Sequence, residues 1–341
     1  MSPGSSGGSA RNQRRMQDSF GRRIDYLRIS VTDKCNLRCV YCMPEAGLPW
    51  LKHEQILSYE EIAAIVQTMT GMGLRRVRLT GGEPLVRRNL SQLVRLLRAI
   101  PQIEDIALST NAVLLAECAD ELRDAGVNRL NISLDSLREE RVDSLARRAG
   151  SYGKILEGIA AAERVGFQPL KINVVLMRGR NDDEIEDFAR LTMRRQWHVR
   201  FIEVMPTGDN LDVSENNYIS ALEILGRLRG LAELQPVAGP PGNGPATYFQ
   251  YAGGVGTIGV ITPMSHNYCD RCNRMRLTAD GHLRPCLFGD LQTNLRDPLR
   301  SGEPLEPLIA ETLRLKPERH YLIQGKASGS GGLRALSQVG G

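Results

Sequence analysis

Three cysteines lie within eight residues of the stretch DKCNLRCVYC, at positions 35, 39 and 42. Their spacing, C-x3-C-x2-C, supplies three thiols on one short loop, whereas a zinc site usually takes four ligands and a disulfide takes two. A cubane iron–sulfur cluster held by three thiolates keeps its fourth iron open to an outside ligand. An open, redox-active iron indicates chemistry at the cluster and not electron transport alone.

A second triplet has the spacing C-x2-C-x13-C and consists of Cys269, Cys272 and Cys286. His266 and His282 lie near it in the sequence, so a zinc site completed by a histidine is an alternative to a second cluster here. The histidine nearest to the first triplet is His53, eleven residues beyond it, which makes zinc a weaker alternative there. The seventh cysteine, Cys118, lies alone in an apolar helical pattern and is interpreted as a core residue.

The elements that must position these residues alternate between strands and helices. Strands are predicted over residues 24–31, 75–80, 105–110, 129–135, 170–177 and 199–205, and helices over 58–71, 89–100, 112–125, 151–165 and 182–195. Strands separated by helices imply right-handed parallel crossovers, hence a doubly wound sheet or a barrel. Six units fall short of the eight in a closed (β/α) barrel.

After residue 206 the pattern changes. We expect one helix over 215–230, then a Pro/Gly loop, short strands over 247–253 and 255–262, and a hairpin around Asp280-Gly281. The predicted organisation is a disordered N-terminal tail (1–22), a partial barrel (23–210), a C-terminal domain with the second triplet (211–326) and a flexible Gly-Gly tail (327–341).

Composition limits the compartment and the partners. The 341 residues have a formal net charge of +5, which fits nucleic acid, a membrane surface or a small polyanion. No apolar run approaches the ~20 residues of a membrane span, so no membrane association is expected. The N-terminal stretch lacks the apolar core of a signal peptide. We therefore expect a cytoplasmic protein, in which clustered cysteines bind metal more often than they form disulfides.

Two motifs carry a resemblance to a known superfamily. CNLRCVYC, with an aromatic residue before its last cysteine, and TGGEP (80–84) resemble the radical S-adenosylmethionine superfamily. CNRMRL (272–277), the second triplet and the terminal Gly-Gly narrow this to a resemblance with the GTP 3′,8-cyclase family of molybdenum cofactor biosynthesis, over nearly the whole chain. The resemblance implies an α/β fold: an incomplete (β/α)6 TIM-like barrel with a C-terminal α+β domain closing its open side.

The resemblance also implies a reaction and its cofactors. Two 4Fe–4S clusters and S-adenosylmethionine would serve a lyase that converts GTP to (8S)-3′,8-cyclo-7,8-dihydroguanosine 5′-triphosphate, the first step of molybdenum cofactor biosynthesis. A 5′-deoxyadenosyl radical would abstract the hydrogen at C3′ of the ribose, and the carbon radical would attack C8 of guanine.

The family's functional residues are carried over by position. The resemblance assigns Cys35, Cys39 and Cys42 to the first cluster and Cys269, Cys272 and Cys286 to the second. It assigns Tyr41, Gly82, Ser133 and Met205 to S-adenosylmethionine. It assigns to GTP the residues Arg28, Arg78, Ser109, Lys171, Asn273, Arg274, Met275 and Arg276. It gives the terminal Gly340 and Gly341 a catalytic role inside the active site. Arginine suits phosphate because its planar fork donates two hydrogen bonds at once.

Expected partners follow from the same resemblance. They are GTP, an unidentified reductase as electron donor and a downstream pyranopterin monophosphate synthase, with the chain a monomer or homodimer.

One alternative is a peptide-modifying radical enzyme with an auxiliary cluster, although Arg274 and Arg276 beside the second triplet favour a nucleotide triphosphate. The other is a non-enzymatic, metal-stabilised nucleic-acid-binding protein. Aromatic residues make up only 5%, which is thin for base stacking, so we expect no nucleic acid partner.

Overall fold

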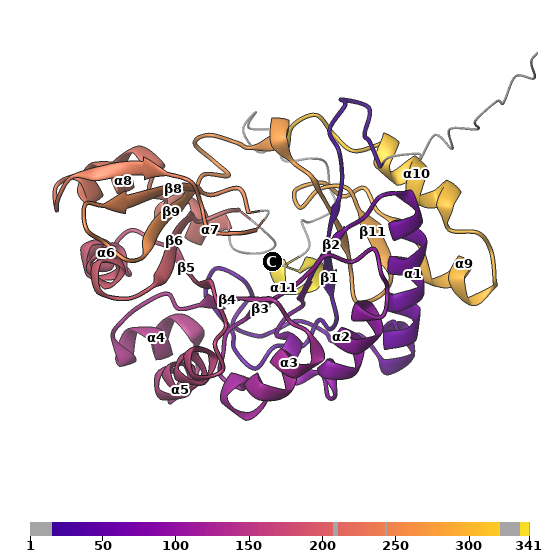
Figure 1. Cartoon of the computed structure of the whole chain (residues 1–341), viewed down its shortest axis with the longest axis horizontal. Helices are drawn as coiled ribbons and strands as arrows, with labels where there is room; N and C mark the ends of the chain where they lie inside the picture. Colours follow the sequence, from indigo (N-terminus) through magenta and orange to yellow (C-terminus); the bar gives the residue numbers. More distant parts are fainter. Residues whose placement is uncertain (1–15, 207–210, 243, 321–334, 341) are drawn as a thin grey trace, which may run out of the picture.

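A computed structural model describes residues 16–206, 211–242, 244–320 and 335–340. Its first six strands are parallel neighbours in chain order: β1 (Tyr26–Ser30), β2 (Arg76–Thr80), β3 (Asp105–Thr110), β4 (Arg129–Ser133), β5 (Leu170–Leu176) and β6 (Trp197–Glu203). The helices between them are α1 (Tyr59–Met72), α2 (Leu90–Arg98), α3 (Ala119–Ala125), α4 (Glu139–Ala146), α5 (Ser151–Arg164) and α6 (Ile185–Arg194). They cover the convex face of a curved sheet, as expected for an incomplete (β/α)6 barrel (Figure 1).

Alternation along the strands separates the core from the concave side. Leu27 and Ile29 on β1, and Val77 and Leu79 on β2, are fully buried in the hydrophobic core. Successive side chains on a strand point to opposite faces. The intervening residues of β1 and β2 therefore face the concave side, where the cavity described below lies.

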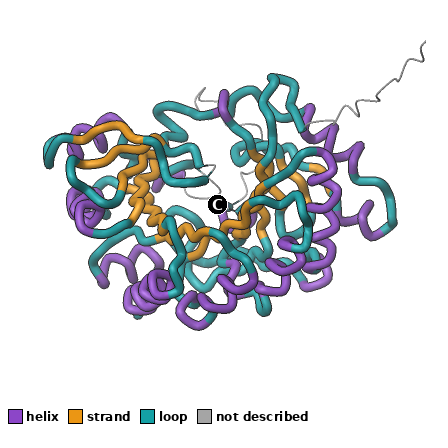
Figure 2. Tube along the Cα trace, viewed as in Figure 1, coloured by secondary structure: helices purple, strands orange, loops and turns teal. Residues whose placement is uncertain are grey.

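The segment after residue 210 extends both edges of this sheet and does not build one of its own. Its elements are α7 (Leu211–Asn216), α8 (Ala221–Arg229), β7 (Leu234–Val237), β8 (Thr247–Tyr251), β9 (Thr257–Ile261), β10 (Arg274–Leu277), β11 (His282–Arg284), β12 (Thr293–Asn294), α9 (Arg296–Arg300), α10 (Glu306–Arg314) and α11 (Leu336–Val339). β10 pairs in parallel with β1, and β9 pairs in parallel with β6, so the described strands form one sheet in the order β12-β11-β10-β1-β2-β3-β4-β5-β6-β9-β8-β7. Figure 2 shows the strands as an arc that is open on one side.

Three local predictions need correction. The helix expected over 215–230 is two helices, because the chain leaves α7 after Asn216 and Ser220 starts α8 by accepting a hydrogen bond from the Glu223 N–H. The helix expected over 112–125 begins only at Ala119, since Ala112 has a left-handed φ of 63°. Helix α4 was not predicted.

The structure describes part of each terminal segment. Residues 16–22 are described: Met16 is 2% exposed, and the Arg22 guanidinium donates to the carbonyls of Cys269, Pro317 and Glu318. Residues 335–340 contain the short helix α11, which lies on the concave side of the sheet (Figure 1). Residues 1–15, 321–334 and Gly341 lie outside the described residues. None of the described helices is long and apolar enough to cross a membrane.

Candidate active site between two cysteine triplets

A cavity opens on the concave side, at the carboxyl ends of the parallel strands. The predicted site residues that line it are Arg28, Cys35, Cys39, Tyr41, Cys42, Arg78, Gly82, Ser109, Ser133, Met205, Arg274 and Arg276. The structure therefore brings together the first triplet, all four residues assigned to S-adenosylmethionine and five of the eight assigned to GTP. Ligands of open α/β sheets bind at this edge.

The TGGEP turn fastens the base of the first cysteine loop. The Gly82 N–H donates to the Thr32 carbonyl at 2.8 Å, and the Glu83 N–H donates to the Lys34 carbonyl at 2.8 Å. A Cβ atom at Gly82 would lie 2.3 Å from the Lys34 carbonyl oxygen, so this contact requires glycine. The glycine thus has a structural reason that sequence reasoning did not supply: it lets the turn pack directly on the backbone that leads into Cys35.

Two carboxylic acids flank the first triplet, of which Glu83 is buried and Asp135 half-buried. Glu83 accepts hydrogen bonds from the Thr110 hydroxyl (2.7 Å) and the Asn111 N–H (2.7 Å), and burial raises its pKa to about 7. Asp135 accepts from the Tyr41 hydroxyl at 2.8 Å, and burial raises its pKa to about 6. Glu83 belongs to the TGGEP motif, and the sequence favoured it as a support for the cofactor site over a residue that only begins a helix. Asp135 ends the strand predicted over 129–135 and was not predicted as part of the site.

The thiols of the first triplet are correspondingly difficult to ionise. Burial raises the pKa of Cys35 to about 11 and that of Cys42 to about 12, and nearby Glu83 adds to the shift of Cys35. Burial, then Asp135, raises the pKa of Cys39 well above its ordinary value. A cation bound among these three thiols would stabilise their thiolate forms and so lower their pKa values.

Three arginines form a row across neighbouring strands. Arg28 on β1 is in register with Arg78 on β2 and with Arg276 on β10. Burial lowers the pKa of the Arg28 guanidinium well below its ordinary value, and repulsion from Arg276 and then Arg78 lowers it further. Neither Arg78 nor Arg276 forms an ion pair with a carboxylate in the described part of the chain. A polyanion would relieve this repulsion.

Arg200 on β6 adds a cation that the sequence prediction missed. It is 2% exposed, lines the cavity and donates to the Asn131 side chain at 2.6 Å. The buried Nε atoms of Arg78, Arg200 and Arg274 have no hydrogen-bond partner among the described residues. Such orphaned donors indicate a ligand with several acceptor oxygens. The alternation along β6 was the available signal, because Arg200 shares its face with Ile202, which also lines the cavity.

Lys171 lies beside this cluster but does not line the cavity. Its ammonium donates to the Pro241 carbonyl at 2.6 Å, and Arg129 donates to the same oxygen at 2.8 Å. Burial, followed by Arg200, Arg129 and Arg78, lowers the pKa of Lys171 to about 6. This hydrogen bond to Pro241 uses one of the three N–H donors of a charged lysine side chain.

Two further predicted residues are directed elsewhere. Met275 is fully buried in the hydrophobic core, because it alternates with Arg274 and Arg276 along β10. The Asn273 side-chain amide donates to Asp25 at 2.8 Å. The structure therefore does not bring these two side chains to the cavity, and their assignment to GTP is not supported by their position.

Two cysteines of the second triplet raise the pKa of the third, as happens in the first triplet, but cationic side chains also lie beside them. Cys286 and Cys272 both raise the pKa of Cys269, after burial, whereas Arg22 lowers it. Although burial alone would raise the pKa of Cys272, Lys316 and Arg274 lower it below its ordinary value.

The histidines near the second triplet lie beside other polar groups. His266 is exposed, with its ring nitrogen 3.4 Å from the Ser265 hydroxyl, and His282 lies 3.1 Å from Asp280. No three Cys, His, Asp or Glu side chains in the described part of the chain are grouped closely enough to hold one metal ion. A cubane binds each thiolate at a different iron, so it suits a wider arrangement of three thiols. The donor sets therefore fit two clusters with three cysteine ligands each.

The C-terminal residues contact both the first cysteine triplet and the row of arginines. The backbone N–H of Ser337 hydrogen-bonds the thiol of Cys42 and lowers its pKa against the effect of burial. The Gly340 carbonyl accepts hydrogen bonds from Arg28 and Arg276. Gly340 has a φ of 72°, and a Cβ there would lie 2.7 Å from the Thr80 side chain, so the position requires glycine.

The match to known families covers both halves of the chain. Residues 29–192 match the Radical SAM superfamily, and residues 197–322 match Molybdenum Cofactor Synthesis C. In fold, the chain resembles Streptococcus suis SuiB bound to S-adenosylmethionine, with a TM-score of 0.57, 14% identity, and coverage of 84% of this chain and 67% of that one. The partial barrel and its first cysteine triplet are thus those of a radical S-adenosylmethionine protein.

Relatives of the whole chain define the family more narrowly. The chain is 49% identical over 329 residues to GTP 3′,8-cyclase of Moorella thermoacetica, covering 96% of this chain and 100% of the relative. It is 46% identical over 331 residues to GTP 3′,8-cyclase of Listeria monocytogenes, covering 96% of this chain and 99% of the relative. The chain belongs to the GTP 3′,8-cyclase family.

Proposed function

We propose that this chain converts GTP to (8S)-3′,8-cyclo-7,8-dihydroguanosine 5′-triphosphate in the cavity that its first cysteine triplet lines, as the first step of molybdenum cofactor biosynthesis. The observation that carries the proposal is the row of Arg28, Arg78 and Arg276, which faces the same cavity as Cys35, Cys39 and Cys42. A triphosphate bound by these arginines would place its nucleoside within the cavity that the first triplet lines.

The first triplet would hold one 4Fe–4S cluster, and Cys269, Cys272 and Cys286 would hold the other. When bound, the first cluster would supply the electron for reductive cleavage of S-adenosylmethionine. The protein's own contribution is to bind and orient. Tyr41, fixed by its hydrogen bond to Asp135, and Gly82, packed on the cysteine loop, would border S-adenosylmethionine.

The arginines would orient GTP by its phosphates, which neutralises their mutual repulsion. The unpaired Nε atoms of Arg78, Arg200 and Arg274 would find acceptors on the same ligand. Gly340, held by Arg28 and Arg276, would lie beside the bound nucleotide, with Gly341 following it. Ser109 and Ser133, which also line the cavity, would offer hydroxyls to the two ligands.

Further parts of the proposal rest on the family and on the sequence. The electron donor would be a reductase, and the product would pass to a pyranopterin monophosphate synthase. The chain would act in the cytoplasm, as a monomer or a homodimer. It would bind neither nucleic acid nor membrane, since its buried arginines line a cavity and not an exposed face.

The test is anaerobic reconstitution with iron and sulfide, followed by reduction in the presence of S-adenosylmethionine. We expect 5′-deoxyadenosine to form much faster with GTP than without it, together with the cyclised product. Equal formation of 5′-deoxyadenosine with GTP and with a peptide substrate, and no cyclised nucleotide, would instead favour a peptide-modifying enzyme.

A further inference from the structure

Lys316 is a buried lysine beside the second cysteine triplet, two residues beyond the end of α10. It is only 3% exposed. The ammonium donates to the Arg274 carbonyl at 2.9 Å and to the Pro285 carbonyl at 2.5 Å, and it also hydrogen-bonds the side chain of Cys272. An ammonium has three N–H donors, so these contacts use all of them.

The three acceptors lie on both segments that carry the later cysteines. Cys272 is contacted directly, and Arg274 follows it at the start of β10. Pro285 immediately precedes Cys286. Lys316 therefore joins the segment of Cys272 to the segment of Cys286, while Arg22 holds the third cysteine by donating to the Cys269 carbonyl at 2.8 Å.

The charge of Lys316 has no carboxylate partner. No Asp or Glu forms an ion pair with it among the residues that the structure describes. Burying an ammonium without a counter-charge costs much free energy. The negative charge available to it is that of the cysteine thiolates, which increases when an iron–sulfur cluster held by them is reduced by one electron.

We propose that Lys316 is a positioning residue of the second iron–sulfur site, which fixes the Cys272 and Cys286 segments and favours the reduced state of the cluster they hold. The inference rests on the second triplet holding a cluster, as in the proposed function. Net charge and hydrogen bonds to sulfur are among the features that set a cluster's reduction potential. By binding the Arg274 carbonyl, the same ammonium also fixes the strand that presents Arg274 to the cavity.

The test measures the midpoint potential of the second cluster alone. In a Cys42→Ala background the first site is disabled, and iron analysis of the full chain should give about four iron atoms per chain. A redox titration followed by electron paramagnetic resonance then reports the remaining cluster. Adding Lys316→Met should shift its reduction equilibrium about tenfold or more towards the oxidised form, which is about 59 mV lower in potential for a one-electron couple.

Lys154→Met is the matched control, because it removes an exposed lysine from α5 and should leave the potential unchanged. If Lys316→Met prevents cluster assembly, Lys316→Gln carries the test, since it keeps a hydrogen-bond donor but loses the charge; the same fall is expected. An unchanged potential in an iron-loaded Lys316 variant would overturn the role of Lys316 alone. Absence of iron from the second site before Lys316 is changed would overturn the cluster itself and this proposal with it.

Discussion

The two cysteine triplets differ in the charges around them. The first lies beside the carboxylic acids Glu83 and Asp135, which together with burial raise the pKa values of its thiols. The second lies beside Lys316 and Arg274, which lower the pKa of Cys272. Similar donor sets of three cysteines have therefore been placed in opposite electrostatic surroundings within one molecule.

This difference separates two tasks. Acidic surroundings disfavour added negative charge, so a cluster at the first site would be a stronger reductant, as cleavage of S-adenosylmethionine requires. Cationic surroundings favour added electrons and also attract a triphosphate. The second site would therefore bind and orient GTP while the first site initiates the chemistry.

The largest effect should come from removing one cysteine of either triplet. Cys42→Ala should abolish formation of 5′-deoxyadenosine, because the first cluster loses a ligand. Cys272→Ala should retain uncoupled 5′-deoxyadenosine formation and lose the cyclised product. Both products can be measured by chromatography of the same anaerobic reaction, with Cys118→Ala as the control outside both triplets. Equal loss of cleavage in the two variants, with the first cluster intact, would remove the division of tasks.

Removing the terminal residues Gly340 and Gly341 should remove the contact between the C-terminal tail and the row of arginines. The Gly340 carbonyl is held by Arg28 and Arg276, whereas no cysteine lies in the tail. Iron content and GTP affinity should remain close to wild type while cyclisation stops. The peptide ALSQVGG, added in excess, should restore part of the activity, and ALSQVAA should not. Full activity of the truncated chain would contradict a role for the tail.

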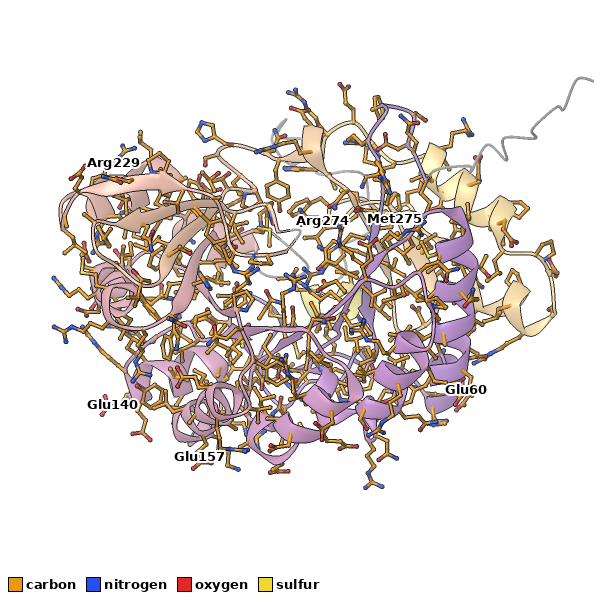
Figure 3. The ribbon with its side chains drawn as sticks, in the orientation of Figure 1. Glu60, Glu140, Glu157, Arg229, Arg274 and Met275 are labelled. Carbon is orange, nitrogen blue, oxygen red and sulfur yellow. The ribbon has the colours of Figure 1, made fainter. Side chains whose placement is uncertain are left out.

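Arg274→Ala should weaken GTP binding by roughly 1.5–3 kcal/mol, the size of a hydrogen bond to a charged group. Guanosine, which lacks phosphates, should be affected much less. Arg229→Ala is the control, because Arg229 is exposed at the outer edge of the molecule (Figure 3). Calorimetric titration gives both affinities, and equal losses for GTP and guanosine would show that Arg274 does not contact the phosphates.

The smallest effect concerns Lys171, whose pKa is lowered to about 6 by burial and by Arg200, Arg129 and Arg78. Asp105 is the nearby acid that raises the pKa of Lys171, but by less than these effects lower it. The pKa of His198 is lowered to about 4, so this side chain is neutral above pH 6. At pH 8 the free lysine is therefore mostly neutral, and a bound triphosphate would raise its pKa, so binding should take up a fraction of a proton. Calorimetry in buffers of different ionisation enthalpy measures this uptake. Lys171→Met should abolish it; uptake that persists in this variant would assign the proton to another group.

Strand alternation and motif spacing predicted much of the site. The same-face spacing of Arg274 and Arg276, and the positions of Arg28 and Arg78 on their strands, placed four cations on one cavity. Local pattern also predicted the six parallel strands closely.

What the sequence did not predict depends on contacts distant in the chain. Lys316 follows α10 in an otherwise ordinary polar stretch, and only the fold shows that it is buried against Cys272. Arg200 lies within β6, where strand alternation alone gives it a face but does not show that this face lines a cavity. Pro241 contacts Lys171 and Arg129 from a loop that lies far along the chain, which no local pattern encodes.

The most direct test of the contrast between the two triplets is a redox titration of the reconstituted wild-type protein without S-adenosylmethionine. The Cys42→Ala and Cys272→Ala variants assign each electron paramagnetic resonance signal to its site. The surroundings of the two triplets predict that the cluster beside Lys316 and Arg274 is reduced at a higher potential than the cluster beside Glu83 and Asp135. Reduction of the first cluster at the same or a higher potential would contradict the account.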